Sequence, residues 1–119
     1  MIPFNVEKAS PDTVKQLLNE WETLHLNISE AHKWRNGSVN EFMFQGIELY
    51  NRLLVSTSDV KDFDTQDIPK YEVLPLNGEE RYRFVLSKTE HYVSFIQLNE
   101  LFDETKKKIS RLRILASKI

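Results

Sequence analysis

Apolar residues spaced three and four positions apart near the C-terminal end constrain the fold more than any other feature. The spacing holds without a break through Phe95, Leu98, Phe102, Thr105, Ile109, Leu112 and Ala116. At 100° per residue, these positions fall within about 100° of arc on one side of an α-helix. The pattern predicts a long amphipathic helix whose apolar stripe must be buried against other elements.

A second stripe of this kind lies near the N-terminal end. Ser10 is a favoured N-cap residue, and Pro11 suits the first helical position, where a missing N–H costs nothing. The helix that they open carries a stripe made of Val14, Leu17, Trp21, Leu24, Ile28 and Ala31. We expect this helix to run to about His32 and to stop before the Asn36-Gly37 pair, which is typical of a turn.

Capping signals predict the remaining helices. Ser38 and Glu41 fit a capping box that opens the second helix. The broad apolar stripe of that helix consists of Phe42, Met43, Ile47, Leu49, Tyr50, Leu53 and Leu54. Gly46 would cost about 1 kcal/mol relative to alanine, so it indicates a close crossing of two helices. Further boxes at 77–80 and 87–90 predict a short third helix and the start of the long last one.

The stretch 56–76 shows no helical period, because aspartates, threonines and two prolines interrupt it. Its apolar residues are too numerous for a free linker: Val60, Phe63, Ile68, Tyr71, Val73 and Leu74. We interpret the stretch as a packed crossover. A connection of this length is either functional or contains a short helix.

These elements together predict an all-α fold. It is a bundle of four, or four to five, helices with a long irregular crossover before the third main helix. The 119 residues suit one domain, 1–119, preceded by an N-terminal tail at 1–9. Three glycines and four prolines are too few for a turn-rich β-sandwich, and they also argue against a glycine-rich phosphate loop.

Composition excludes several classes of protein. The chain contains no cysteine, which rules out disulfide scaffolds, thiol catalysis and cysteine-based zinc or iron–sulfur sites. No apolar run approaches the roughly 18 residues of a membrane span, and the first residues lack the pattern of a secretory signal. We therefore expect a water-soluble, cytoplasmic protein that does not enter a membrane.

One phrase near the C-terminal end points to a family. Glu80 to Ser87 reads ERYRFVLS, and it is followed by His91 to Leu98, HYVSFIQL, and by Leu101-Phe102. The phrase resembles the YpoC-like family of small proteins from Gram-positive bacteria, which carries arginine and proline where Lys88-Thr89 stands here. The resemblance implies a helical cytoplasmic protein, often encoded near genes of DNA replication and repair. It brings no catalytic residues to transfer.

The most notable polar residues lie in this phrase. Projected on the last helix, His91 and Ser94 fall on or beside the apolar face, Gln97 lies at its edge and Tyr92 points away. An inward polar group needs partners, or it costs roughly 1–3 kcal/mol. His91 and Ser94 are therefore either hydrogen-bonded core residues, with partners such as Arg81, or part of a ligand-binding site.

Trp34 follows the first helix and stands between Lys33 and Arg35, near the turn. It either packs against the turn and holds it in place, which we expect, or is an exposed anchor for a partner. Tryptophan and arginine are enriched in the residues that dominate protein interfaces.

Signals for metal binding and catalysis are incomplete. Glu22 and His25 have the Glu-x-x-His spacing of di-iron bundles, but such sites need a second copy and two further glutamates. Four-helix nucleases of the HEPN type place a polar residue after an arginine and a histidine soon beyond it. Arg83 is followed by Phe84, and His91 lies too far along the chain. We predict no catalytic, metal-binding or cofactor-binding residues.

Charge is unevenly distributed along the chain. Seven acidic residues lie within 59–80, whereas 104–119 holds six basic residues. Lys107, Arg111 and Lys118 point directly away from the apolar stripe, together with Ile114. Interaction with the helix dipole and plain solvation explain this basic stripe, yet it would also suit an acidic partner or a phosphate backbone.

Two functional hypotheses follow, with a weaker third. The first is a non-enzymatic protein-protein interaction module whose partner is another protein. The alternative is a nucleic-acid-binding accessory factor in DNA replication or repair that uses the basic stripe. The third is an enzyme with its site at His91. The sequence leaves the oligomeric state open and implies no cofactor.

Overall fold

Four α-helices and one short 3₁₀ helix make up the part of the chain that the computed structural model describes, residues 1–35 and 37–118. In chain order they are α1 (Pro11–Lys33), α2 (Val39–Ser56), the 3₁₀ helix η1 (Thr65–Lys70), α3 (Gly78–Ser87) and α4 (Tyr92–Ser117). The expected all-α bundle is therefore confirmed, as is the crossover before the third main helix. None of the described helices is both long enough and apolar enough to cross a membrane.

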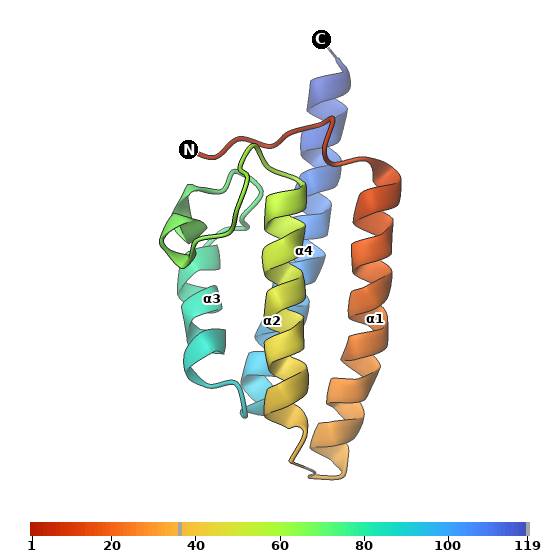
Figure 1. Cartoon of the computed structure of the whole chain (residues 1–119), viewed down its shortest axis with the longest axis vertical. Coiled ribbons are helices and arrows are strands. Elements are labelled where there is room, and N and C mark those ends of the chain that lie inside the picture. The colour runs from red at the N-terminus through yellow and green to blue at the C-terminus, as the bar shows by residue number, and fades with distance from the viewer. Residues whose placement is uncertain (36, 119) are drawn as a thin grey trace.

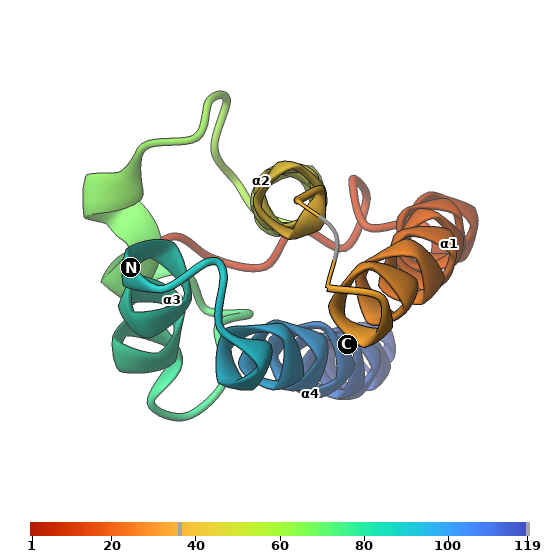
Figure 2. The same ribbon diagram turned by 90° about the horizontal axis from the view of Figure 1, so that it is seen from below.

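The helices pack side by side around one core. In Figure 1, α2 lies in front of α4, with α1 on one side and α3 on the other. The end view in Figure 2 shows α4 between α1 and α3, on the side of the bundle opposite α2. The C-terminal end of α4 extends past the other helices (Figure 1). One side of α4 therefore faces away from the bundle along its whole length.

The two predicted stripes form the core. Every residue of the stripe in α1 is buried. In α4 the stripe is buried from Phe95 to Ile109, whereas Leu112 and Ala116 are half-buried because the end of the helix projects beyond its neighbours. Both stripes were expected from spacing alone, because burial on one side of a helix is what produces the spacing.

The predicted close crossing at Gly46 is confirmed. A Cβ atom on Gly46 would lie 2.9 Å from the Trp21 ring and 3.0 Å from a methyl group of Leu98. The Trp21 ring stacks on Phe102, with ring centroids 4.2 Å apart. The absence of a side chain on α2 at this point lets α1 and α4 meet beneath it.

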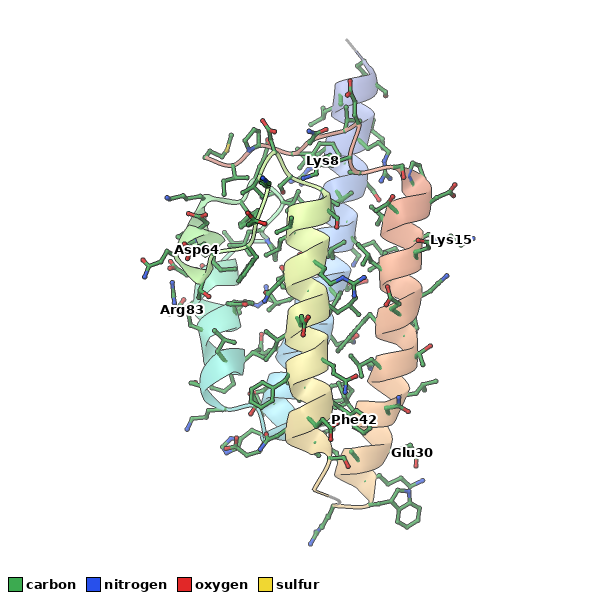
Figure 3. All side chains as sticks on the ribbon, in the orientation of Figure 1. Lys8, Lys15, Glu30, Phe42, Asp64 and Arg83 are labelled. Carbon is green, nitrogen blue, oxygen red and sulfur yellow. The ribbon has the colours of Figure 1, made fainter. Side chains whose placement is uncertain are left out.

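Residues 1–9, expected as a tail, are built into the fold. Ile2 pairs with Tyr71 and Phe4 pairs with Ser58 in isolated β-bridges to the crossover. The Lys8 ammonium group donates hydrogen bonds to the carbonyls of residues 55, 58 and 60, at 2.8, 2.6 and 2.9 Å. Lys8 (labelled in Figure 3) thus satisfies free carbonyls at and just beyond the C-terminal end of α2, where a positive charge is favourable.

The crossover is packed, as predicted, and contains a short helix. The Asp64 carboxylate accepts a hydrogen bond from the backbone N–H of Gln66 at the start of η1. Ile68 and Tyr71 are buried in the core together with Val73. The crossover fills the space between α2 and α3 above the short third helix (Figure 1).

The predicted caps were only partly right, because α2 and α3 begin after Ser38 and Asn77 as expected but neither residue has the extended backbone of a usual N-cap. Ser10 caps α1 as expected and accepts a hydrogen bond from the N–H of Thr13 at 3.2 Å. Ser38 instead has helical backbone angles, and Asn77 begins α3 in the left-handed region, at φ 57°. Asn36, the first residue of the predicted Asn36-Gly37 turn, lies outside the described residues.

The box at 87–90 was wrong as the start of α4, which begins at Tyr92. The Thr89 hydroxyl donates a hydrogen bond to the side-chain oxygen of Asn40 at 2.8 Å, and Thr89 is buried. Residues 88–91 therefore form a link held against the start of α2 instead of the first turn of a helix.

Candidate interaction surface

Four apolar side chains are exposed where α3 meets the start of α4. Tyr92, Val93, Ile96 and Phe84 are 54%, 52%, 40% and 37% exposed, respectively. On α4, Val93 and Ile96 are three residues apart and Tyr92 and Ile96 four, so their side chains are neighbours. These four residues are called the α3–α4 face below. The predicted outward direction of Tyr92 is confirmed.

A shallow groove of about 250 Å³ crosses this face between the two helices. Phe84 and Val93 line it together with Glu80, Arg81 and Gln97. The Arg81 Nε donates a hydrogen bond to the Gln97 side-chain oxygen at 3.1 Å. The groove thus has apolar walls and polar groups at its edge, which is typical of a binding site for an apolar side chain.

Arg81 also fixes the position of α3 on α4. Its guanidinium group donates two hydrogen bonds to the Glu104 carboxylate, at 3.0 and 2.7 Å, and lies 3.5 Å from Glu100. The hydrogen bonds to Glu104 raise the pKa of Arg81, and the same bonds lower the pKa of Glu104. Because the contact is bidentate and charged, it sets the angle between the helices.

The expected inward position is wrong for His91 and right for Ser94, although Ser94 lacks the hydrogen-bond partner expected of a core residue. His91 is the N-cap of α4, has an extended backbone and is exposed. Its Nε2 lies 3.3 Å from the Glu90 carboxylate, and both side chains are more than half exposed. Ser94 is fully buried, and its hydroxyl has no hydrogen-bond partner among the described residues. The two residues therefore do not form a joint polar site.

Two half-buried histidines connect the start of α4 to α1. The His25 ring lies 4.8 Å from the Phe95 ring, and the His32 ring lies 5.8 Å from it. His32 also meets Tyr92 edge-on at 5.2 Å. The His32 Nε2 is buried without a hydrogen-bond partner, and burial lowers the pKa of His32. The two histidines thus belong to an aromatic cluster with Tyr92 and Phe95.

Trp34 does not pack into the turn as expected. Its side chain is 68% exposed, its indole N–H donates to the Glu30 carboxylate at 2.8 Å, and the Lys33 ammonium lies 5.3 Å from the ring centroid. The ring is held against its own helix.

The predicted basic stripe lies near the other end of α4. Lys107, Arg111 and Lys118 are exposed, as is Ile114. Lys107 pairs with Asp103 one turn earlier, at 3.0 Å. Lys107 and Arg111 also line a groove of about 380 Å³ between α4 and residues 74–76, whereas Lys118 lies beyond this groove.

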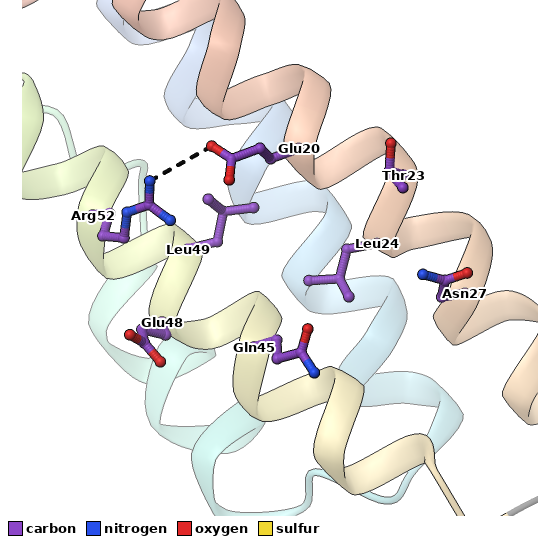
Figure 4. A pocket seen from close by; sticks show the side chains of 8 residues that line it. All are labelled: Glu20, Thr23, Leu24, Asn27, Gln45, Glu48, Leu49 and Arg52. Atoms are coloured by element: carbon purple, nitrogen blue, oxygen red, sulfur yellow. Dashed lines mark ion pairs between the residues drawn. The ribbon is translucent and has the colours of Figure 1, made fainter.

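A larger groove, of about 460 Å³, runs between α1 and α2. Figure 4 shows Arg52 and Glu20 meeting across it, at 3.5 Å, above a floor of Leu24 and Leu49. Arg52 and Glu20 pair with each other, and the further charged residue of the lining is Glu48, so the groove offers a ligand no uncommitted positive group. Among residues 1–35 and 37–118, no group of three histidine, aspartate or glutamate side chains is placed to hold a metal ion.

Comparison with known proteins identifies the family. The model of the family described as YpoC-like protein matches residues 11–117, which include all four α-helices. The chain belongs to the YpoC-like family. It is 44% identical over 99 residues to a Bacillus subtilis (strain 168) protein named "Uncharacterized protein YpoC", covering 79% of this chain. The match spans 60% of the length of that relative. No solved structure matches the chain.

The resemblance drawn from the phrase at Glu80–Leu98 is thereby confirmed for this YpoC-like chain. Sequence reasoning nevertheless missed Phe84 and Val93, which are the most open apolar walls of the groove. A signal was present, because Val93 is an apolar residue that lies about 150° from the centre of the predicted apolar stripe of α4. Phe84, an aromatic residue that directly follows Arg83 in the predicted short helix, is a second signal of this kind.

Proposed function

We propose that this chain is a non-enzymatic protein-interaction module that binds its partner through the α3–α4 face, in the cytoplasm as the family resemblance implies. The observation that carries the proposal is that Phe84 and Val93 are exposed in the walls of a groove, while Tyr92 and Ile96 are exposed beside Val93 on α4. Single exposed apolar residues are common on soluble proteins, whereas clusters with a polar rim mark binding sites.

The size of the face favours a short segment over a second folded copy. Even aromatic side chains expose only about 150–250 Å² when fully open. Four side chains that are about half exposed therefore fall short of the roughly 800 Å² that each side of a stable interface contributes. A single amphipathic helix or an extended segment needs less area.

Charge around the face indicates the chemistry of that segment. Glu80 and Glu90 are exposed near its edge, and Glu100 follows Ile96 by one turn of α4. Arg81 partly neutralises Glu100, at 3.5 Å, and no ion pair joins Glu80 to another described residue. We infer a partner segment with apolar anchors flanked by basic residues, because complementary charge directs and selects the encounter.

Nucleic acid is the less favoured partner. Phosphate binding needs uncompensated positive charge, whereas the outward side of α4 alternates in sign. Glu100 and Asp103 precede Lys107, and Asp103 pairs with Lys107 directly. If the partner were a nucleic acid, the binding affinity should fall steeply as the salt concentration rises.

Affinity capture with matched variants tests the proposal. The tagged wild-type chain is compared with the double variant Val93→Asp and Ile96→Asp. The control is Leu26→Asp with Phe44→Asp, which adds the same charge at exposed apolar positions on α1 and α2. Circular dichroism first verifies that all three proteins are folded.

We expect the tagged wild type and the control variant to capture at least one protein that the α3–α4 variant does not capture. That protein must also bind as a purified component, with an affinity reduced about tenfold or more by the α3–α4 substitutions. Identical capture by all three proteins would contradict the proposal. Retention of nucleic acid alone would favour the alternative.

A further inference from the structure

A second surface lies at the other end of α4. Leu74, Pro75 and Leu76 of the crossover face Lys107, Lys108 and Arg111 across a groove of about 380 Å³, which is called the basic groove below. Leu76 is 83% exposed, the most open leucine of the chain as described. An open leucine beside three basic side chains is unlike the α3–α4 face, whose groove is lined by Glu80 and by an Arg81 that is bound to Glu104.

The basic groove is preformed. The Lys108 ammonium donates a hydrogen bond to the Leu74 carbonyl at 2.8 Å, and Arg81 donates to the Leu76 carbonyl at 3.3 Å. A Cβ on Gly78 would lie 2.5 Å from the Leu74 side chain, so the chain turns closely past its own leucine there. Residues 74–76 are therefore tied to both α3 and α4, and a ligand would not have to order them.

The charge that remains available in the basic groove is positive. Glu104 lines the groove, but its carboxylate is bound by Arg81 through two hydrogen bonds. No ion pair joins Arg111 to any described residue, and its side chain is exposed. The Lys107 pair with Asp103 is open to solvent on both sides, so it is weak and exchangeable.

We propose that the basic groove binds an acidic segment of another protein, with an apolar side chain against Leu76 and carboxylates facing Arg111 and Lys107. Such a segment would complement the positive charge of the groove and cover its open apolar contact at the same place. A phosphate backbone would leave Leu76 without an apolar partner, and the groove has no aromatic residue on which bases could stack. This site is independent of the α3–α4 face.

An NMR titration of the full, ¹⁵N-labelled chain tests the proposal. The probe is a short blocked peptide in which glutamates alternate with leucines. The comparison probes are the same peptide with glutamine in place of glutamate, and single-stranded oligothymidine. We expect the acidic peptide alone to shift the amide signals of 74–77 and 104–111, and binding to weaken as salt rises.

Substitutions with matched controls localise the effect. Arg111→Glu is expected to weaken peptide binding about tenfold, and Leu76→Ser to weaken it several-fold. Lys15→Glu makes the same charge change on an exposed site of α1 (labelled in Figure 3), and Leu26→Ser removes a similarly open leucine. Neither control should alter the affinity by more than about twofold.

Four results would overturn the proposal: no shift in 74–77 and 104–111 with the acidic peptide, equal shifts with the glutamine peptide, tighter binding of oligothymidine, or equal losses in the control variants. Shifts of the same signals on raising the concentration of the chain alone would assign the groove to a second copy, which also overturns it. The double variant Val93→Asp and Ile96→Asp should bind the acidic peptide normally. A failure of this proposal can therefore be distinguished from a failure of the proposal for the α3–α4 face.

Discussion

Arg81 in α3 holds Glu104 in α4 through two hydrogen bonds, at 3.0 and 2.7 Å. The two residues stand between two distinct surfaces, because Arg81 also lines the groove of the α3–α4 face and Glu104 also lines the basic groove. The side chain of Arg81 is only 18% exposed, so the pair is shielded from water on one side. We therefore infer that the Arg81–Glu104 pair fixes the positions of the two surfaces relative to each other.

Removing the guanidinium group should destabilise the protein. Arg81→Ala is expected to lower the free energy of unfolding by about 2–3 kcal/mol, because it leaves Glu104 and Gln97 without their charged donor. Arg83→Ala is the matched control, since the Arg83 pair with Glu79 is exposed on both sides. Its cost should stay below about 1 kcal/mol in urea unfolding. Equal costs would refute the special role of Arg81.

Stability should fall as pH is lowered below neutrality, because of His32. Burial lowers the pKa of His32 from 6.5, so the unfolded chain takes up a proton more readily than the folded one. Stability is then complete above pH 6.5 and is lost as pH falls below this value, until the lower folded pKa is passed. Urea unfolding of the wild type and His32→Gln across this window measures the effect. An equally steep fall in the variant would exclude His32 as the cause.

Glu104 should affect the pH dependence of stability in a separate, more acidic pH range. Its hydrogen bonds with Arg81 lower its pKa from 4.5, so its contribution is present above that pH and is lost as pH falls through the folded pKa. Glu104→Gln should flatten the fall in stability below pH 4.5 while leaving the His32 window unchanged. Unfolding curves at several acidic pH values compare the variant with the wild type. A variant that keeps the full acidic fall would contradict this assignment.

The close crossing at Gly46 predicts an unfavourable alanine. Although alanine favours a helix by about 1 kcal/mol over glycine, its methyl group would meet the Trp21 ring at 2.9 Å. Gly46→Ala should therefore lower stability by about 1–3 kcal/mol. Gly37→Ala is the control, because no atom lies within 4 Å of its added Cβ. Thermal unfolding compares the two, and a stabilised Gly46→Ala would show that α2 can move away.

Removing the Ser94 hydroxyl, in contrast, should not destabilise the protein. Its buried hydroxyl has no partner among the described residues, so it contributes a desolvation cost without a compensating bond. Ser94→Ala is expected to leave stability unchanged or to raise it by up to about 1 kcal/mol in urea unfolding. A clear loss of stability would show that the hydroxyl has a partner in solution.

The helices and their buried sides were readable from the sequence because burial on one side imposes a local period. The stripe of α1 was predicted residue by residue, and Gly46 signalled its close contact by being a poor helix former. Ser10 was recognised as a cap because its hydrogen bond reaches only three residues along the chain. These features depend on neighbours in the sequence.

The features that failed depend on distant contacts. Thr89 binds Asn40, 49 residues away, and α4 begins beyond the predicted box, at Tyr92. His91 therefore has an extended backbone, and its projection onto a helical face had no meaning. Lys8 reaches carbonyls about 50 residues further along, so residues 1–9 could not be recognised as part of the fold. Of the candidate surface, Tyr92 and Gln97 were placed correctly, but Phe84 and Val93 were not singled out.

The most direct test of the account is photo-crosslinking from Val93 in the native cell. Val93 is replaced by the photoreactive p-benzoylphenylalanine, and the same replacement at Leu26, which is at least as exposed, serves as the control. We predict a crosslinked product of this chain with a different protein from position 93 and not from position 26. The absence of any product at position 93, equal products at both positions, or a product with the mass of two copies of the chain would contradict the account.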